Sequence, residues 1–257
     1  MAVELITPDW PAPANVSAFV TTRVGGVSTG VYRGLNVGDH VGDEPAAVQA
    51  NRELLQECLE PETQLQWLSQ VHGVDVIRAP CQGAIPIADT QWTNQPQIAC
   101  AIMTADCLPV LFCDYSGTVV AAAHAGWRGL LAGVLEATIN AMPVTTGDLM
   151  AWLGPAIGPR AFEVGGEVRD AFLADANALE EQAIAACFHP DVPDSNRFYC
   201  DLYALARLRL SRSGLTAIYG GEDCTYSDSK RFYSYRRDGQ TGRMVSLIYL
   251  NQNNLPT

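Results

Sequence analysis

One cysteine and two histidines stand at the ends of short apolar runs that read as strands: Cys107, His124 and His72. Each is followed within two residues by a proline or a glycine, which favours a loop directly after the candidate ligand. Thiolate sulfur and imidazole nitrogen are ligands that zinc prefers, and a catalytic zinc site keeps three protein ligands and one open position. The three residues therefore predict a metal site with room for chemistry, provided that the fold brings the strand ends together. The intervals between them match no short metal-binding signature.

The identity of the metal depends on how many histidines the chain can supply. Cysteine and histidine also suit copper, and Met103 is a conceivable axial ligand, although an apolar run is a typical setting for a core methionine. A laccase-type oxidase also needs a multicopper cluster rich in histidine, and the whole chain contains only four histidines. Zinc with an open fourth position is therefore the simpler assignment. Zinc would lower the pKa of a bound water toward neutrality and so supply a nucleophile.

A chemistry without metal can use the same residues. Cys107 could act as a nucleophile with His124 as its general base, which is the arrangement of a cysteine hydrolase. The thiol of Cys107 could equally be a small buried apolar group, as most cysteines between apolar strands are. A binding protein without turnover is a further alternative. Metal analysis separates ligand from nucleophile, because one sulfur hardly serves in both roles at once.

Arginines form the second group of residues suited to chemistry. They stand beside glycine-rich loops or near the C-terminal end of the sequence: Arg23, Arg128, Arg236, Arg237 and Arg243. The guanidinium fork suits phosphate oxygens, and in a chain with a formal net charge of −12 such arginines could form a local anion site. A serine-hydrolase pattern at 26–30 is followed by a loop-like stretch and not by the helix that a nucleophile elbow requires. No dinucleotide, phosphate-loop or zinc-deaminase signature occurs.

The composition limits the class of protein. A chain of 257 residues with 48% hydrophobic residues can bury a substantial core. The sequence pI of about 4.6 argues against nucleic acid or a membrane surface as partner, because phosphate backbones and anionic lipids repel an acidic surface. No basic and apolar leader begins the chain, no apolar run is long enough to span a membrane, and the eight cysteines contain no C-x-x-C pair. We therefore expect a cytoplasmic protein with reduced cysteines, and a monomer by default.

Strands and helices alternate along the chain without an internal repeat, which predicts one mixed α and β domain over residues 1–257. Expected strands cover 17–22, 66–71, 74–78, 98–103, 110–113, 119–123, 150–153, 217–219, 232–235 and 244–250. Expected helices cover 44–58, 129–142, 166–174 and 201–213. The least ordered stretch is expected at 188–197, which is rich in proline and aspartate.

The sequence resembles the YfiH family over nearly its whole length. Matches in the N-terminal half are TTRVGGVS at 21–28, LNVG at 35–38, HVGD at 40–43 and QVHG at 70–73. The central matches are TADC at 104–107 and HAGWRG at 124–129. Those in the C-terminal half are LGPAIGP at 153–159, CTY at 224–226, YRRD at 235–238 and TGR at 241–243. So many spaced matches are highly specific. The family has also been called the laccase domain or multicopper polyphenol oxidase family.

The resemblance implies a fold, an activity and a set of metal ligands. The implied fold is α+β, a single-domain mixed α-β-α-β sandwich also seen in cysteine-hydrolase toxins. The implied activity is phosphorolysis of adenosine, inosine, guanosine and methylthioadenosine, with adenosine deamination in the same site. Nucleoside and phosphate are then the expected partners. The family's metal ligands fall on His72, Cys107 and His124, with zinc as the expected cofactor and copper oxidation as the alternative. Related proteins have also been linked to editing of cell-wall peptide precursors.

Residue roles beyond the metal ligands are our own hypothesis. We expect Arg237 to act in catalysis together with the three ligands. We expect substrate-binding roles for Arg23, Asn36, Arg128 and Arg236. These assignments rest on positions beside glycine-rich loops or within the family motifs. In phosphorolysis the phosphate attacks C1′ of the ribose while the purine leaves, so arginines would hold the phosphate and a metal or a hydrogen-bond donor would stabilise the departing base.

Overall fold

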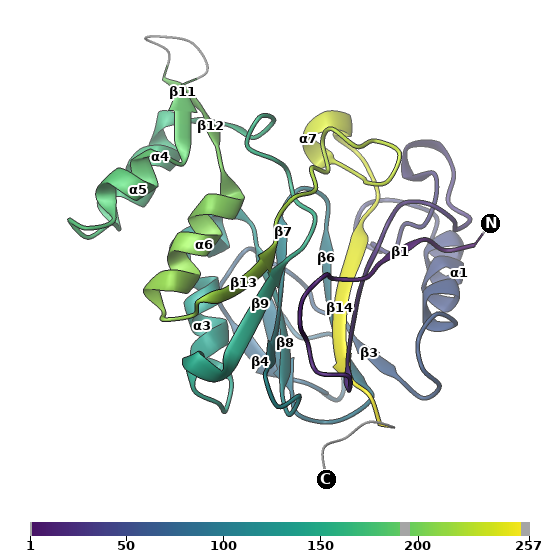
Figure 1. Ribbon diagram of the computed structural model, residues 1–257. Coiled ribbons are helices and arrows are strands. Elements are labelled where there is room, and N and C mark those ends of the chain that lie inside the picture. Colours follow the sequence, from purple (N-terminus) through teal and green to yellow (C-terminus); the bar gives the residue numbers. More distant parts are fainter. Residues whose placement is uncertain (1, 191–195, 253–257) are drawn as a thin grey trace.

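Two large β-sheets lie at the centre of the molecule (Figure 1). The computed structural model describes residues 2–190 and 196–252. The five-stranded sheet has the order β1 (Leu5–Ile6), β2 (Val16–Thr21), β14 (Met244–Leu250), β6 (Ile98–Thr104) and β3 (Gln64–Gln66). The six-stranded sheet has the order β13 (Ala217–Gly220), β9 (Leu149–Leu153), β7 (Leu108–Asp114), β8 (Val120–Ala125), β5 (Thr90–Thr93) and β4 (Val76–Arg78). Both sheets mix parallel and antiparallel pairs.

A third, small sheet and the helices surround these two. The small sheet has the order β10 (Glu163–Gly165), β12 (Arg197–Cys200) and β11 (Phe188–Pro190). The α-helices are α1 (Pro45–Gln56), α2 (Trp127–Ala132), α3 (Val134–Ala141), α4 (Gly166–Ala174), α5 (Glu181–Ala185), α6 (Leu202–Arg212) and α7 (Tyr235–Asp238). Two 3₁₀ turns complete the structure, η1 (Gly30–Tyr32) and η2 (Thr146–Asp148). Helix α1 covers one side of the sheet pair, and α3 and α6 cover the other (Figure 1).

The two large sheets pack directly against each other because their central strands are apolar on both faces. Side chains alternate along a strand, so a strand buried on both sides contributes to two cores. In β6, Ile102 belongs to the core between the sheets, and its neighbour Met103 belongs to the core under α1. In β7, Leu111 faces the space between the sheets and Phe112 faces the helices on the other side. The layers therefore follow the order helix, sheet, sheet, helix.

The mixed α and β class is confirmed, and within it the two sheets lie next to each other instead of being separated by helices as an α-β-α-β order implies. Most predicted elements are present. Helix α6 begins after Asp201, whose side chain accepts a 2.9 Å hydrogen bond from the backbone N–H of Ala204. The eight cysteines form no disulfide. Within the described residues, no helix has the length and apolar character needed to cross a bilayer.

Several predicted elements are wrong in their bounds or type. The helix expected over 129–142 is two helices, α2 and α3, because Gly133 between them adopts a φ of 96°. The strand expected over 66–71 ends at Gln66. The strand expected over 232–235 is absent, because residues 232–234 are irregular and Ser234 caps helix α7 instead. Of the stretch expected to be least ordered, 188–190 forms β11, while 191–195 lies outside the described residues.

Candidate metal centre and its cavity

His72, Cys107 and His124 converge at one point of the fold. Their ligand atoms all lie within 4.8 Å of one another. The Sγ of Cys107 is 3.7 Å from Nε2 of His72, and the two imidazole rings meet edge to face with centroids 4.7 Å apart. His124 is buried, Cys107 is half-buried and His72 is exposed, so the cluster opens to solvent on the side of His72.

The local sequence explains why these side chains meet. Cys107 lies between β6 and β7, and β7 pairs with β8 so that Pro109 lies opposite His124. The cysteine therefore immediately precedes the strand that neighbours the strand of His124. Gly126, two residues after His124, lies against the other two side chains. A Cβ at this position would lie 2.8 Å from Cδ2 of His72 and 2.9 Å from Sγ of Cys107. Only glycine leaves room for the cluster here.

Asp89 organises both histidines from a fully buried position just before β5. Its Oδ1 lies 2.7 Å from Nδ1 of His124, so the other ring nitrogen, Nε2, is left to act as a ligand. The same carboxylate accepts backbone hydrogen bonds from His72 at 2.9 Å and Gly73 at 2.6 Å. Asp89 was not among the residues singled out from the sequence. Its only signal there is a carboxylate after the apolar stretch 84–88.

The electrostatics of the cluster favour a thiolate beside a charged imidazole. Burial by itself would raise the pKa of the Cys107 thiol, but the charge and hydrogen bonds of His124, and then those of His72, outweigh it and lower the pKa to about 6. Burial would lower the pKa of His124, but Cys107 and Asp89 raise it to about 9. A thiolate with two imidazoles is a donor set that fits a zinc ion. Copper accepts the same donors.

The remaining candidates for copper ligands lie elsewhere. Met103 borders the cavity but packs mainly in the core beneath α1. His40 is exposed at the rim of the cavity, and His189 is exposed on β11. Within the described part of the chain, His72, Cys107 and His124 are the only cluster of histidine, cysteine and acidic side chains with metal-binding geometry. A multicopper cluster would need further histidines that these residues do not supply.

The cluster forms part of the wall of a cavity of about 460 Å³. This volume lies in the range of small-molecule sites. One part of its wall is apolar or aromatic and includes Trp127, Ile157, Phe162, Leu202 and Tyr235. The polar part includes the three candidate metal ligands, the carboxylate of Asp106 and three guanidinium groups, those of Arg128, Arg236 and Arg243.

Among the described residues, none of these three arginines forms an ion pair within 4.0 Å, because the ion pairs there involve other arginines or the histidines His40 and His124. Arg128 lies over the ring of Trp127, and Arg236 donates a hydrogen bond to the carbonyl oxygen of Glu163 at 2.8 Å. Arg243 is half-buried, and its Nη1 donates to the carbonyl oxygens of residues 241 and 242. The carboxylate of Asp106 also lines the cavity, but both of its oxygens accept hydrogen bonds, from the hydroxyl of Thr225 and the backbone N–H of Arg236. Three guanidinium groups beside one carboxylate leave a surplus of positive charge, which favours an anion.

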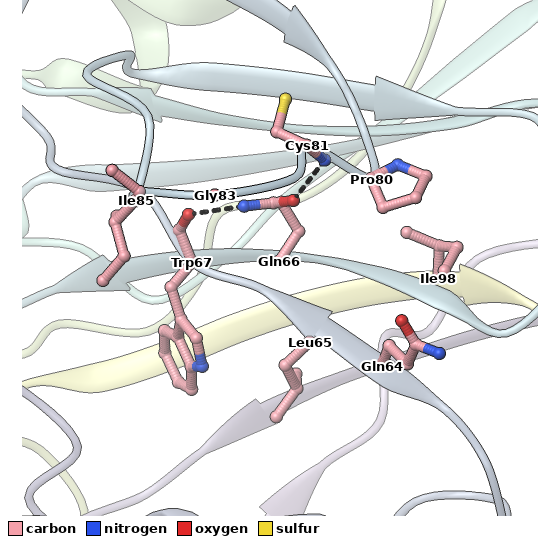
Figure 2. Close-up of a pocket in the computed structure, with 10 residues that line it drawn as sticks. Gln64, Leu65, Gln66, Trp67, Pro80, Cys81, Gly83, Ile85 and Ile98 are labelled. Carbon is pink, nitrogen blue, oxygen red and sulfur yellow. Dashed lines mark hydrogen bonds between the residues drawn. The ribbon is translucent and has the colours of Figure 1, made fainter.

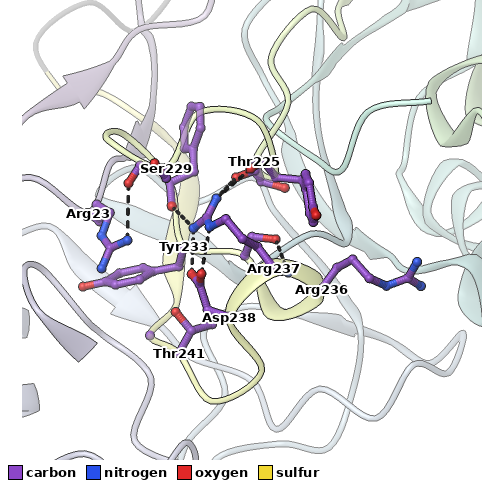
Figure 3. Close-up of polar contacts among 12 residues, drawn as sticks. Arg23, Thr225, Ser229, Tyr233, Arg236, Arg237, Asp238 and Thr241 are labelled. Carbon is purple, nitrogen blue, oxygen red and sulfur yellow. Dashed lines mark hydrogen bonds and ion pairs between the residues drawn. The ribbon is translucent and has the colours of Figure 1, made fainter. Parts of the chain in front are cut away.

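The structure places the other predicted substrate residues outside this wall. Arg237 donates hydrogen bonds to the carbonyl oxygens of Thr225, Tyr226 and Phe232 and pairs with Asp238 (Figure 3). Arg23 donates to the carbonyl oxygens of residues 33 and 229 and lies over the ring of Tyr233. These contacts hold loops together.

Asn36 is likewise part of the scaffold. It is fully buried and donates to the carboxylate of Asp43 at 2.9 Å. Its Oδ1 accepts backbone hydrogen bonds from Gly38 and Arg243. Asn36 therefore positions the segment that carries Arg243, one of the cavity arginines. From the sequence, Arg243 is among the arginines suited to an anion site, but no catalytic or substrate-binding role is predicted for it.

A second cavity, of about 200 Å³, lies beside β3 on the edge of the five-stranded sheet (Figure 2). The amide of Gln66 spans it, accepting a hydrogen bond from the backbone N–H of Cys81 and donating to the carbonyl oxygen of Trp67. Its lining contains amide, thiol and apolar side chains but no histidine, acidic or basic residue. It offers no counterpart to the chemistry of the first cavity.

A mixed sandwich with a Cys–His–His cluster in the wall of an arginine-lined cavity defines this chain as a mixed α and β protein with a candidate metal site. The chain belongs to the family described as multi-copper polyphenol oxidoreductase laccase, whose pattern matches residues 17–251. The YfiH resemblance is thereby confirmed.

Named relatives and solved structures cover almost the whole chain. The purine nucleoside phosphorylase of Pseudomonas aeruginosa is 57% identical over 245 residues, which is 95% of this chain and 98% of the relative. The purine nucleoside phosphorylase YfiH of Escherichia coli is 50% identical over 96% and 99%. A crystal structure from Neisseria meningitidis matches with a TM-score of 0.90 at 52% identity, over 96% of this chain and 99% of the other. YlmD from Geobacillus stearothermophilus matches with a TM-score of 0.87 at 32% identity, over 94% of each chain.

Proposed function

We propose that this chain is a purine nucleoside phosphorylase. The observation that carries the proposal is the placement of three guanidinium groups, none of them in an ion pair among the described residues, beside a Cys–His–His cluster in one cavity of about 460 Å³. Phosphorolysis needs a phosphate site and a nucleoside site next to each other, and the cavity offers both chemistries. Two relatives at 57% and 50% identity carry the name purine nucleoside phosphorylase.

The residues of the cavity would divide the reaction between them. Arg128, Arg236 and Arg243 hold and orient the phosphate, whose oxygen forms a bond to C1′ as the bond from C1′ to the purine nitrogen breaks. The electron pair of that bond leaves with the purine. The aromatic and apolar wall binds the base and excludes water, which would otherwise compete with phosphate. Tyr235, exposed at the rim, is placed to stack on a purine.

We assign the metal as zinc, held by His72, Cys107 and His124. A bound zinc ion supplies a Lewis acid with an open position and can lower the pKa of a coordinated water. Asp89 keeps both histidines in place for it. The expected substrates are adenosine, inosine, guanosine and methylthioadenosine, with deamination of adenosine as a side activity. We propose that the chain acts in the cytoplasm, as one catalytic domain and as a monomer.

Product analysis tests this proposal directly. The protein is incubated with adenosine or inosine, each with and without inorganic phosphate, and the products are separated by chromatography. We expect ribose 1-phosphate and the free base only when phosphate is present, and inosine from adenosine in either case. A protein with stoichiometric zinc that releases no base from any nucleoside would contradict the phosphorylase assignment. Oxygen uptake with phenols and stoichiometric copper would instead support an oxidase.

The contact between Asp89 and His124 also favours a second candidate, a cysteine hydrolase acting on cell-wall peptide precursors. Asp89, His124 and Cys107 have the order of orienting acid, base and nucleophile. A hydrolase of this kind needs a free thiol at Cys107, whereas the phosphorylase proposal needs this sulfur bound to a metal. Metal content together with thiol titration of the purified protein distinguishes the two.

A further inference from the structure

Asp106 occupies a constrained position directly before the metal ligand Cys107. It is a non-glycine residue with a φ of 97°, a region that side chains rarely adopt, and it is almost fully buried. A backbone of this kind persists only where surrounding contacts hold it, and such positions are common at functional sites. The contacts of Asp106 are therefore informative about how Cys107 is held.

The carboxylate of Asp106 connects the ligand loop to a segment far away in the sequence. Its Oδ1 accepts a hydrogen bond of 2.6 Å from the hydroxyl of Thr225, and its Oδ2 accepts one of 2.7 Å from the backbone N–H of Arg236. Its own carbonyl oxygen accepts a third, of 2.9 Å, from the N–H of Ile157. Ile157 and Arg236 both line the metal cavity.

The distant segment is itself closed into a rigid loop. Arg237 binds the carbonyl oxygens of Thr225 at 2.7 Å and Phe232 at 2.9 Å, and Ser234 caps helix α7. Figure 3 shows that the side chain of Arg237 points into this loop, whereas that of Arg236 extends away from it. The loop therefore fixes the backbone of Arg236, while its guanidinium lies at the cavity wall and donates to the carbonyl oxygen of Glu163.

We propose that Asp106 is a positioning residue that sets the Cys107 ligand and the Arg236 guanidinium in a fixed arrangement. The carboxylate of Asp106 links the backbone next to Cys107 to the backbone of Arg236. The positions of the metal site and the anion site therefore depend on each other. This role of Asp106 rests on the proposed phosphorylase function in one respect, because it assumes that Arg236 contacts phosphate.

The test compares Asp106→Asn with Asp114→Asn in the full chain. Asp114 is a matched control, because it is also buried and ends β7, the strand that follows Asp106, but among the described residues its carboxylate binds only residues 118 and 119. An asparagine keeps one acceptor oxygen for the N–H of Arg236, but its amide group can only donate to the hydroxyl of Thr225, so Asp106→Asn reverses one contact and removes the charge from both. We expect zinc affinity, measured by competition with a chelator, to fall about tenfold or more in Asp106→Asn and to stay within twofold in Asp114→Asn.

Calorimetric binding of inorganic phosphate to the zinc-loaded protein provides a readout that does not depend on turnover. We expect it to weaken about tenfold in Asp106→Asn and to be retained in Thr225→Ser, which keeps the hydroxyl, but not in Thr225→Val. Asp106→Gly serves as a second variant, because glycine accepts a positive φ without strain while losing both carboxylate contacts. Loss of folding stability in these variants with unchanged zinc and phosphate affinities would overturn the proposal. A wild-type protein that binds zinc and phosphate but shows no phosphorolysis would refute the proposed function and leave the role of Asp106 testable.

Discussion

The Oδ1 of Asp89 lies 2.7 Å from Nδ1 of His124, and the same carboxylate binds the backbone N–H of His72. One buried acid thus holds two candidate metal ligands that are far apart in the sequence. A carboxylate behind a ligating histidine fixes the tautomer and the direction of the ring. Asp89 therefore positions both histidines of the candidate metal site.

Replacement of Asp89 by asparagine should therefore weaken metal binding. The amide can still contact Nδ1 of His124, but it no longer supplies a charge or enough acceptors for the N–H groups of residues 71–73. We expect zinc affinity to fall about 10- to 100-fold, which chelator competition measures. Asp114→Asn again serves as the control. Equal zinc affinity in Asp89→Asn and wild type would show that the histidines are positioned by packing alone.

Substitution of Gly126 by alanine should block the metal site by its methyl group. The backbone of Gly126 has a φ of −64° and a ψ of 158°, which alanine adopts without strain, so the clash with His72 and Cys107 is the main effect. We expect at least a tenfold loss of zinc affinity and a cost in stability of about 1–3 kcal/mol. Gly147→Ala is the matched control, because a Cβ there would meet nothing within 4 Å. Zinc content that is the same in both variants would contradict the geometry described above.

The pH dependence of alkylation should identify Cys107 in protein stripped of metal by a chelator. Because its pKa is lowered to about 6, the thiolate forms as the pH rises through 6, and alkylation by iodoacetamide should be near its maximal rate at pH 7. The exposed Cys58, whose pKa is raised by partial burial and by Glu57, should react at high pH only. Peptide mass spectrometry measures both sites. Zinc should protect Cys107, and a midpoint near 9 for this residue would be inconsistent with the cluster.

The neighbouring residues Arg236 and Arg237 should respond differently to substitution. Arg236→Ala should raise the phosphate KM about tenfold and leave the nucleoside KM nearly unchanged, because its guanidinium lines the cavity. Arg237→Ala should lower the free energy of unfolding by about 1–3 kcal/mol, because the carbonyl oxygens of residues 225, 226 and 232 lose their donor. Steady-state kinetics and urea unfolding of both variants check this. A reversed pattern would place Arg237 at the substrate, as the sequence alone suggested.

Much of the framework could be predicted from local sequence patterns. The strand over Met244–Leu250 is confirmed because a continuous apolar run of that length is typical of a strand buried on both faces. By contrast, the sequence pattern did not predict β5, because Thr90–Thr93 is short and largely polar. The role of Asp89, which directly precedes that strand, was therefore not predicted either. Gly133 interrupts a run that is otherwise well suited to a helix, so its effect on 129–142 became visible only in the backbone.

The three candidate ligands and the family can be identified from the sequence, because residue types and their places at strand ends do not depend on how the strands pair. Which other side chains line the site depends on the tertiary structure. Arg236 and Arg237 are adjacent and chemically identical, and their different directions depend on contacts with Asp106 and Thr225, more than a hundred positions away in the case of Asp106. Strand pairing and loop contacts of this range are set by packing of the whole chain, and no local pattern encodes them.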